Sequence, residues 1–326
     1  MTRPLVLLLV VLLALSAVGA QDTRPAPDTR PASKPVTAAG GWITDYQQAK
    51  QQAKAEGKDL LLDFTGSDWC VWCIRLRKEV FDNPSFQKKA PMAFVLLEVD
   101  FPHAKKQPDA LREQNQKLRQ AFAVQGYPTV YLADADGRPY ARTGYDEVGP
   151  EIYLVRLVEL REKIRQKRDA AFQQAAESEG PERARYLAAG LAALQPGIPL
   201  DDYLPVIDEI LRLDPEDKQG LRTRYTQVKK RIALDTAMRA LSQQLDALAA
   251  KKQWSEAIAA VERFRKDKKP EGNILQQLVW IQAMAHFELD QRKQALAKFE
   301  EILALDPESD LGKQAAKAIQ VIGKTR

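Results

Sequence analysis

Short apolar runs alternate with longer amphipathic stretches between residues 42 and 167 of this 326-residue chain. The apolar runs predict four strands, at 60–64, 93–101, 129–133 and 138–144. The amphipathic stretches predict helices, at 42–56, 70–80, 108–123 and 151–167. Gly57 marks the end of the first helix, and the turn-forming segment 134–137 joins the last two strands as a hairpin. Strands and helices in this order predict an α/β domain with a mixed sheet.

From about residue 170 the strand patterns disappear, and apolar residues recur with helical spacing. Two stripes lie on consecutive predicted helices: Leu234, Met238, Leu241, Leu245 and Leu248, then Ala257, Ile258, Val261 and Phe264. The segments 252–257 and 291–295 predict equivalent turns that lead into matching helices. The pattern Leu-x-Leu-Asp-Pro-Glu occurs at both 211–216 and 303–308. The second half of the chain is therefore predicted to be an all-α domain built from related helical pairs.

These helical pairs resemble tetratricopeptide repeats. Ala257 and Ala295 take the small position of the repeat, and Val261 and Phe299 take the large position four residues later. Pro307 closes a repeat. The separation of the two Asp-Pro motifs is not a multiple of the usual ~34 residues, so irregular helical hairpins stay an alternative. The resemblance implies a concave surface for a protein or peptide partner, with a structural or dimerisation role as the alternative.

The amino terminus has the three parts of a secretory signal peptide. Met1–Pro4 is a short cationic lead, residues 5–18 are apolar, and small residues provide a cleavage site after Ala20. The apolar run is shorter than the ~20 residues that span a bilayer, and no cysteine follows it to carry a lipid. We therefore expect a periplasmic or otherwise extracytoplasmic mature chain without a membrane anchor.

Residues 21–41 are rich in proline and repeat the sequence Asp-Thr-Arg-Pro-Ala, which is typical of an extended linker. The predicted division of the chain is a signal peptide at 1–20, a linker at 21–41, an α/β domain at 42–169 and a helical domain at 170–326. The formal net charge is +5, and charges of both signs alternate along the predicted helices. We therefore expect no nucleic-acid partner.

Cys70 and Cys73 are the only cysteines in the sequence, and they stand at the start of the predicted helix 70–80. A single pair excludes a disulfide framework and a four-thiolate zinc site, and Ile74 in place of histidine excludes c-type haem attachment. The N–H groups and dipole of a helix N-terminus stabilise a thiolate at Cys70. The pattern predicts a redox dithiol with Cys70 as the nucleophile and the more buried Cys73 as the resolving thiol. Two inert structural thiols are the alternative.

Three segments in this order, Leu62–Phe64, Trp69–Cys73 and Gly126–Thr129, resemble landmarks of the thioredoxin superfamily. Residues 63–70 are similar to its secreted bacterial thioredoxin-like branch, and the resemblance covers roughly residues 42–165. It implies a cis peptide bond before Pro128 that faces the dithiol, with Tyr127 lining a substrate groove. An ordinary trans-proline is the alternative.

The resemblance also implies roles for side chains near the dithiol. Asp63 matches the buried acid that accepts the proton of the resolving thiol. Because the segment from Asp63 to Cys70 is one residue longer than usual, a loop-capping role is the alternative. Trp69 would shield the thiols, and Trp72 replaces a proline or histidine, which favours a reductase or isomerase over an oxidase. We interpret His103 as a loop histidine.

Together these features predict an exported thiol–disulfide oxidoreductase that acts on protein or peptide disulfides through Cys70 and Cys73. A redox partner thiol protein would regenerate the dithiol, and the helical repeats would recruit clients or another partner. No metal or organic cofactor is expected. The alternative is a non-catalytic scaffold, in which the repeats bind a partner and the α/β domain is passive.

Overall fold

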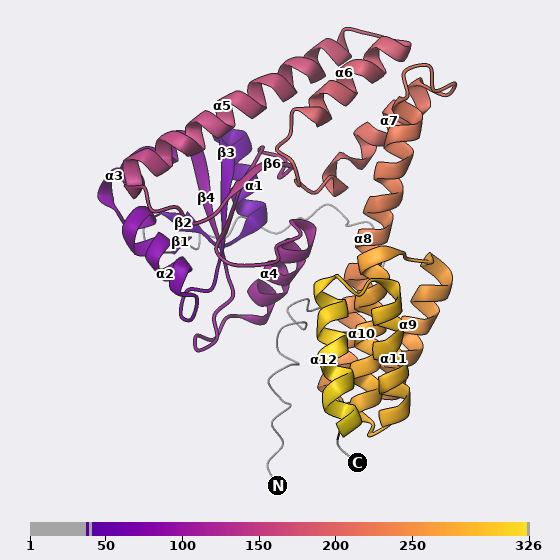
Figure 1. Ribbon diagram of the computed structural model, residues 1–326. Coiled ribbons are helices and arrows are strands. Elements are labelled where there is room, and N and C mark those ends of the chain that lie inside the picture. Colours follow the sequence, from indigo (N-terminus) through magenta and orange to yellow (C-terminus); the bar gives the residue numbers. More distant parts are fainter. Residues whose placement is uncertain (1–36, 39–40, 325–326) are drawn as a thin grey trace. The chain divides into compact units, whose positions relative to one another are not determined.

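The computed structural model describes Thr37, Ala38 and residues 41–324 (Figure 1). The predicted signal peptide and most of the predicted linker lie outside the described residues. The chain forms two compact units, one that continues to Ile232 and one that begins at Ala233. The division falls inside the long helix α8 (Leu221–Ala250).

A mixed sheet forms the centre of the first unit, as the sequence predicted, but the described residues contribute six strands to it where four were predicted. Its strands are β1 (Thr37–Ala38), β2 (Trp42–Ile43), β3 (Asp59–Thr65), β4 (Phe94–Asp100), β5 (Thr129–Ala133) and β6 (Pro139–Thr143). They lie side by side in the order β1-β2-β4-β3-β5-β6. The central strand β3 pairs parallel with β4 along its whole length and antiparallel with β5, and β5 and β6 form the predicted hairpin.

The start of this unit differs from the prediction. Trp42 and Ile43 form strand β2, so the helix predicted at 42–56 is shorter and α1 spans Tyr46–Glu56. Both β2 residues are buried, whereas the Gln- and Lys-rich sequence after them is suited to a surface helix. Asp45 caps this helix by accepting a hydrogen bond from the Gln48 N–H at 2.9 Å.

Helix α1 ends at the predicted residue, whereas a short strand before it was not predicted. Gly57 ends α1 with a φ of 64°, in the left-handed conformation expected of the predicted helix terminus. Thr37 and Ala38, which fall within the predicted linker, pair with β2 as strand β1. A two-residue strand carries too little hydrophobic pattern to be recognised from the sequence.

Helices cover both faces of the sheet (Figure 1). The helical elements are α2 (Val71–Leu76), the π-helix η2 (Arg77–Phe81), α3 (Pro84–Lys89), the short η3 (Ala90–Met92), α4 (Asp109–Ala121) and α5 (Gly149–Ala176). Because side chains alternate along a strand, Leu61 of β3 packs on one face with Leu76 and Val80 of α2 and η2. Leu60 and Leu62 pack on the other face with buried residues of α1 and α4.

The compact unit that contains the sheet continues past residue 170, and the predicted domain division at 169/170 stays a prediction. Helix α5 continues to Ala176, well beyond the predicted end at 167. It is followed by α6 (Gly180–Ala192), η4 (Asp201–Tyr203) and α7 (Leu204–Leu213). Ile207 of α7 and Tyr225 of α8 belong to the same hydrophobic cluster as Leu61 of the sheet. The compact unit therefore extends to Ile232, because these later helices complete its core.

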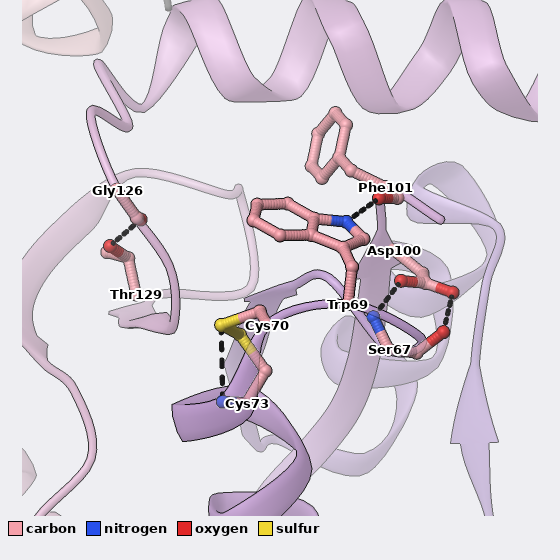
Figure 2. The surroundings of a disulfide bond; sticks show 8 residues. All are labelled: Ser67, Trp69, Cys70, Cys73, Asp100, Phe101, Gly126 and Thr129. Carbon is pink, nitrogen blue, oxygen red and sulfur yellow. Dashed lines mark hydrogen bonds between the residues drawn. A yellow bond between two sulfur atoms is a disulfide. The ribbon is translucent and has the colours of Figure 1, made fainter. Parts of the chain in front are cut away.

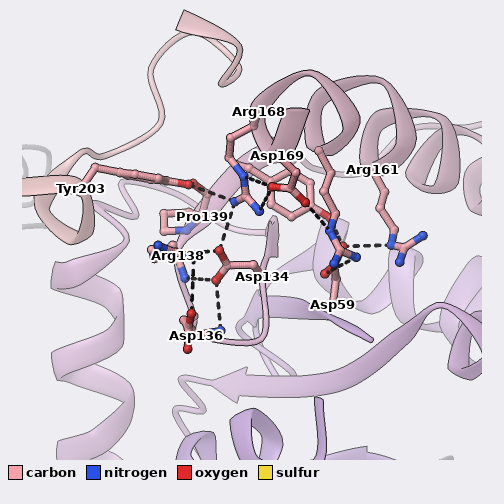
Figure 3. A network of polar contacts seen from close by, with 12 residues as sticks. Asp59, Asp134, Asp136, Arg138, Pro139, Arg161, Arg168, Asp169 and Tyr203 are labelled. Carbon is pink, nitrogen blue, oxygen red and sulfur yellow. Dashed lines mark hydrogen bonds and ion pairs between the residues drawn. The ribbon is translucent and has the colours of Figure 1, made fainter. Parts of the chain in front are cut away.

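A buried polar network joins α5 to the sheet (Figure 3). Arg168 of α5 is only 3% exposed and forms an ion pair with Asp134, in the turn between β5 and β6, at 3.1 Å. Its guanidinium also donates to the Tyr203 hydroxyl, which in turn donates to the carbonyl of Pro139. Nearer the start of α5, Arg161 and Arg165 pair with the buried Asp59 at 2.9 and 3.0 Å.

The second unit contains the rest of α8 and the helices α9 (Trp254–Lys268), α10 (Gly272–Glu288), α11 (Arg292–Leu305) and α12 (Asp310–Lys324). The turns before α9 and α11 are equivalent, as predicted. Lys252 and Asp290 have φ values of 57° and 56°, and the residues after them share nearly the same φ and ψ. The helical character of this unit is confirmed, and its assignment to tetratricopeptide repeats stays a prediction.

In the described part of the chain, no helix combines the length and the apolar character that crossing a membrane requires.

Candidate functional site

Cys70 and Cys73 form a disulfide at the start of α2 (Figure 2). Cys70 is the N-cap residue, and its Sγ accepts a hydrogen bond from the backbone N–H of Cys73 at 3.3 Å. Cys70 is 7% exposed and Cys73 is 2% exposed, so the first sulfur is the more accessible of the two. The helix N-terminus therefore points its free N–H groups at the sulfur that the sequence analysis named as the nucleophile.

The loop from β3 to Cys70 is held by hydrogen bonds to the end of β4. The carboxylate of Asp100 accepts from the backbone N–H and the hydroxyl of Ser67, at 2.9 and 2.6 Å. The carbonyl of Gly66 accepts from the Cys70 N–H at 3.0 Å. A Cβ at Gly66 would lie 2.5 Å from the Trp69 ring, so only glycine fits this close approach.

Asp68 fixes the neighbouring loop after β4. Its carboxylate accepts three backbone N–H groups, from His103 at 2.8 Å, Ala104 at 2.7 Å and Lys105 at 3.1 Å. These donors hold the pKa of Asp68 below its ordinary value. Asp68, which immediately precedes Trp69 and Cys70, thus fixes the loop 103–105 near the disulfide.

Trp69 lies at the centre of an aromatic cluster beside this loop. Its indole N–H donates to the Phe101 carbonyl at 2.8 Å, as Figure 2 shows. Its ring stacks on His103, with 4.5 Å between the ring centroids, and meets Tyr127 edge-on at 5.8 Å. The structure therefore brings the predicted residues Trp69 and Tyr127 together, and it places the loop histidine His103 on the Trp69 ring.

The peptide bond between Tyr127 and Pro128 is cis, as predicted. The turn that contains it is closed by a hydrogen bond from the Thr129 hydroxyl to the Gly126 carbonyl at 2.7 Å. Figure 2 shows this turn across from the disulfide. That Tyr127 and Pro128 bind substrate stays a prediction.

Trp72 belongs to a different group of contacts, on the exposed side of α2. Its ring lies 5.5 Å from that of Tyr145, and the guanidinium of Arg75 lies over both rings. Arg75 also pairs with Glu79 and Glu147, at 2.9 and 2.7 Å. Trp72 is 53% exposed, so a large apolar surface stays accessible beside the sulfurs.

Asp63 lies within the core of the first unit. It stands two residues after Leu61 on β3, so its side chain is on the same sheet face, which is covered by α2 and η2. It is 3% exposed, and among the described residues its Oδ1 has no hydrogen-bond partner. The pKa of Asp63 is raised to about 8, chiefly by burial and also by Glu98 and Asp100, while Arg77 lowers it. Its role as the proton acceptor of Cys73 stays a prediction.

The sequence analysis did not single out Asp68, Asp100, Phe101 or Tyr145. One signal for the two acids was present, since Asp68 closely follows strand β3 and Asp100 ends strand β4. Parallel strands bring their carboxyl ends to the same edge of a sheet, where functional loops gather. The contacts of Phe101 and Tyr145 depend on loop conformations that the sequence pattern does not specify.

The disulfide lies at a helix N-terminus after strand β3, and a cis-proline turn lies across from it. This combination defines a thiol–disulfide oxidoreductase. Residues 46–153 match the family model described as a thioredoxin-like domain. The chain therefore belongs to the thioredoxin-like family, as its motifs predicted.

The chain is similar to two curated proteins and to one solved structure. It is 34% identical over 122 residues to the disulfide bond reductase DsbH of Chlamydia pneumoniae, which covers 37% of this chain and 74% of DsbH. It is 31% identical over 202 residues to the thioredoxin-related protein DsbJ of the same organism, covering 56% of this chain and 57% of DsbJ. A solved structure of a DsbH oxidoreductase is 32% identical with a TM-score of 0.36, covering 44% of this chain and 94% of that one.

Replacing Gly66 with alanine should displace the Trp69 ring, because the new Cβ would overlap it. We expect kcat/KM for reduction of insulin disulfides to fall by about tenfold or more, since the ring borders the reacting sulfur. Gly126→Ala is the matched control, because a Cβ there meets no atom within 4 Å. Equal activity of the two variants would contradict a role for the Trp69 position.

Proposed function

We propose that this protein is an exported thiol–disulfide reductase or isomerase that acts on protein disulfides through Cys70 and Cys73. The observation that carries the proposal is the dithiol itself: the more accessible sulfur sits at a helix N-terminus and the second sulfur is buried one turn later. The signal-peptide pattern supports an extracytoplasmic location, where disulfides persist in client proteins.

In the reduced protein, the free N–H groups at the start of α2 stabilise the Cys70 thiolate. This thiolate attacks a sulfur of the client disulfide and forms a mixed disulfide, with release of one client thiol. Cys73 then attacks Cys70 and releases the second client thiol. A redox partner thiol protein would reduce the resulting Cys70–Cys73 disulfide and complete the cycle.

The surface around Cys70 is suited to protein clients. Trp69, Val71, Trp72 and Ile74 surround the sulfurs in the sequence and are all exposed large apolar residues. Exposed apolar side chains beside a reactive group are typical of a site that binds another protein. The similarity to DsbH, which is named as a disulfide bond reductase, supports the reductase direction.

We also propose that the second unit recruits client proteins. An apolar groove with a volume of 170 Å³ lies among helices α8, α9 and α10, and Ile281 and Met284 of α10 are among its lining residues. Helical hairpins that stack in sequence create such grooves for segments of other proteins. The rival function, a passive scaffold, uses the same groove without any thiol chemistry.

Replacing Cys73 with serine should trap clients on Cys70, because a serine hydroxyl cannot attack the Cys70 sulfur and displace the client sulfur that is bound to it. The trapped species should appear as a higher-mass band on a non-reducing gel and disappear on addition of reductant. Cys70→Ser should trap far less, because the Cys73 sulfur is the more buried one. Equal trapping by both variants would contradict the assigned roles, and trapping by neither would favour the scaffold.

The reduction potential of the Cys70–Cys73 couple should lie on the reducing side of about −180 mV, the value of protein disulfide isomerase. The two residues between the cysteines, Val71 and Trp72, supply no cation that would stabilise the Cys70 thiolate further. Equilibration with glutathione buffers, followed by separation of the two redox forms, measures this potential. A value near about −120 mV would instead indicate an oxidase.

Client recruitment can be tested by adding Met284→Lys to the trapping variant Cys73→Ser. A charge in the apolar groove should lower the yield of trapped native clients while leaving reaction with a small aromatic disulfide unchanged. Leu305→Lys is the matched control, because Leu305 is an exposed apolar residue of α11 that does not line this groove. An unchanged yield of trapped clients with the Met284→Lys variant would contradict a role of the second unit in client binding.

A further inference from the structure

A cluster of charged side chains lies on the sheet face beneath the disulfide. Asp63 of β3 is directly opposite Glu98 of β4 in the parallel register, so the two carboxyl side chains are neighbours on the same face. Glu98 is largely buried, with 17% of its side chain exposed. Two neighbouring buried carboxyl groups oppose each other's ionisation. The charge state of Asp63 therefore depends on whether a cation neutralises Glu98.

Arg77 supplies the neutralising charge. Its Nη1 pairs with Glu98 at 2.6 Å, its Nε pairs with Asp82 at 2.9 Å, and its guanidinium lies over the ring of Trp42 at 5.4 Å. Arg77 is also four residues after Cys73, and its backbone N–H bonds to the Cys73 carbonyl. The guanidinium is therefore held on the helical segment that carries the resolving cysteine.

The charged or titratable groups that act on Asp63 come from three packed elements. Glu98 and Asp100 on β4 and Arg77 on η2 affect its ionisation, and Tyr153 of α5 is close enough for Asp63 to raise the pKa of its hydroxyl. Among these groups, Arg77 is the one that favours the ionised form of Asp63. The balance between Arg77 and the neighbouring carboxylates thus decides when Asp63 can act as a base.

We propose that the Arg77–Glu98 ion pair is a positioning element for catalysis, which sets the pH range in which Asp63 accepts the proton of Cys73 during release of the client. The proposal rests on the proposed function, because it concerns the resolving step of the same dithiol. Arg77 and Glu98 touch neither substrate nor sulfur in this scheme, and they act through Asp63.

Cys73 gives its thiol proton to the carboxylate of Asp63, and the resulting thiolate forms a bond to the Sγ of Cys70. The bond between Cys70 and the client sulfur breaks, and the client thiolate leaves with the electron pair. Over the whole cycle two electrons pass from the dithiol to the client disulfide. The resolving step therefore becomes faster as pH rises through the pKa of Asp63, because the ionised form is the base.

A small aromatic disulfide, 5,5′-dithiobis(2-nitrobenzoate), reports this step on the full-length reduced protein. Its first coloured thiolate is released when Cys70 attacks, and its second is released when Cys73 resolves the mixed disulfide. Stopped-flow measurement of the second release between about pH 5 and 10 gives a rate profile with a midpoint. For the wild type this midpoint should lie near the Asp63 pKa of about 8.

The two partners of the ion pair should move the midpoint in opposite directions. Glu98→Gln removes a negative neighbour of Asp63 and keeps the positive charge of Arg77, so the midpoint should fall by about one pH unit. Arg77→Met removes the cation, so the midpoint should rise by about one pH unit. The double variant removes both charges and should lie between the two. Asp63→Asn should abolish the pH step altogether.

Lys78→Met is the matched control, since it removes one positive charge at the next position of η2 from an exposed side chain, and its midpoint should not move. Shifts of both partner variants in the same direction, or of neither, would overturn the proposal. If Arg77→Met fails to fold, the nearly isosteric variant Glu98→Gln tests the proposal by itself. A midpoint of this variant that is unchanged or raised would then contradict the proposal. A wild type without any second release would refute the proposed function, whereas a normal release with unmoved midpoints would refute only this inference.

Discussion

The parallel pairing of β3 with β4 is the constraint on which the site depends. It runs from Asp59 opposite Phe94 to Thr65 opposite Asp100, so the two strands end at the same level of the sheet. The segments that follow them must therefore meet, and Asp68 and Asp100 join them with reciprocal hydrogen bonds. Trp69 and the disulfide take their positions from this junction, and no covalent link between the two segments is needed.

Helix α5 connects the site to the later part of the first unit. Its beginning carries Tyr153, next to Asp63, and its end carries the buried Arg168. Removing either partner of a buried ion pair costs about 3–5 kcal/mol, because an uncompensated charge is left behind. The Arg168 contacts to Asp134 and Tyr203 therefore couple the helices after residue 170 to the stability of the sheet.

Strong local signals made the sheet and the dithiol predictable. Long apolar runs identified β3 and β4, and Cys70, Cys73 and the cis bond before Pro128 followed from motifs with a fixed chain order. Features made by distant segments were not predictable. The Asp68 carboxylate binds a loop 35 to 37 residues away, and β2 was assigned to a helix because two residues carry no periodicity.

The presence of only two cysteines in 326 residues also affects how the chain matures. Two thiols permit a single intramolecular pairing, whereas four would allow three. A chain that folds in an oxidising environment therefore has no scrambled isomers of its own to correct. The cysteines are also close neighbours in the sequence, so their bond can close before the strands have paired. A protein that exchanges disulfides in others therefore needs no isomerase to correct its own pairing, although an oxidant must accept two electrons when its single disulfide forms.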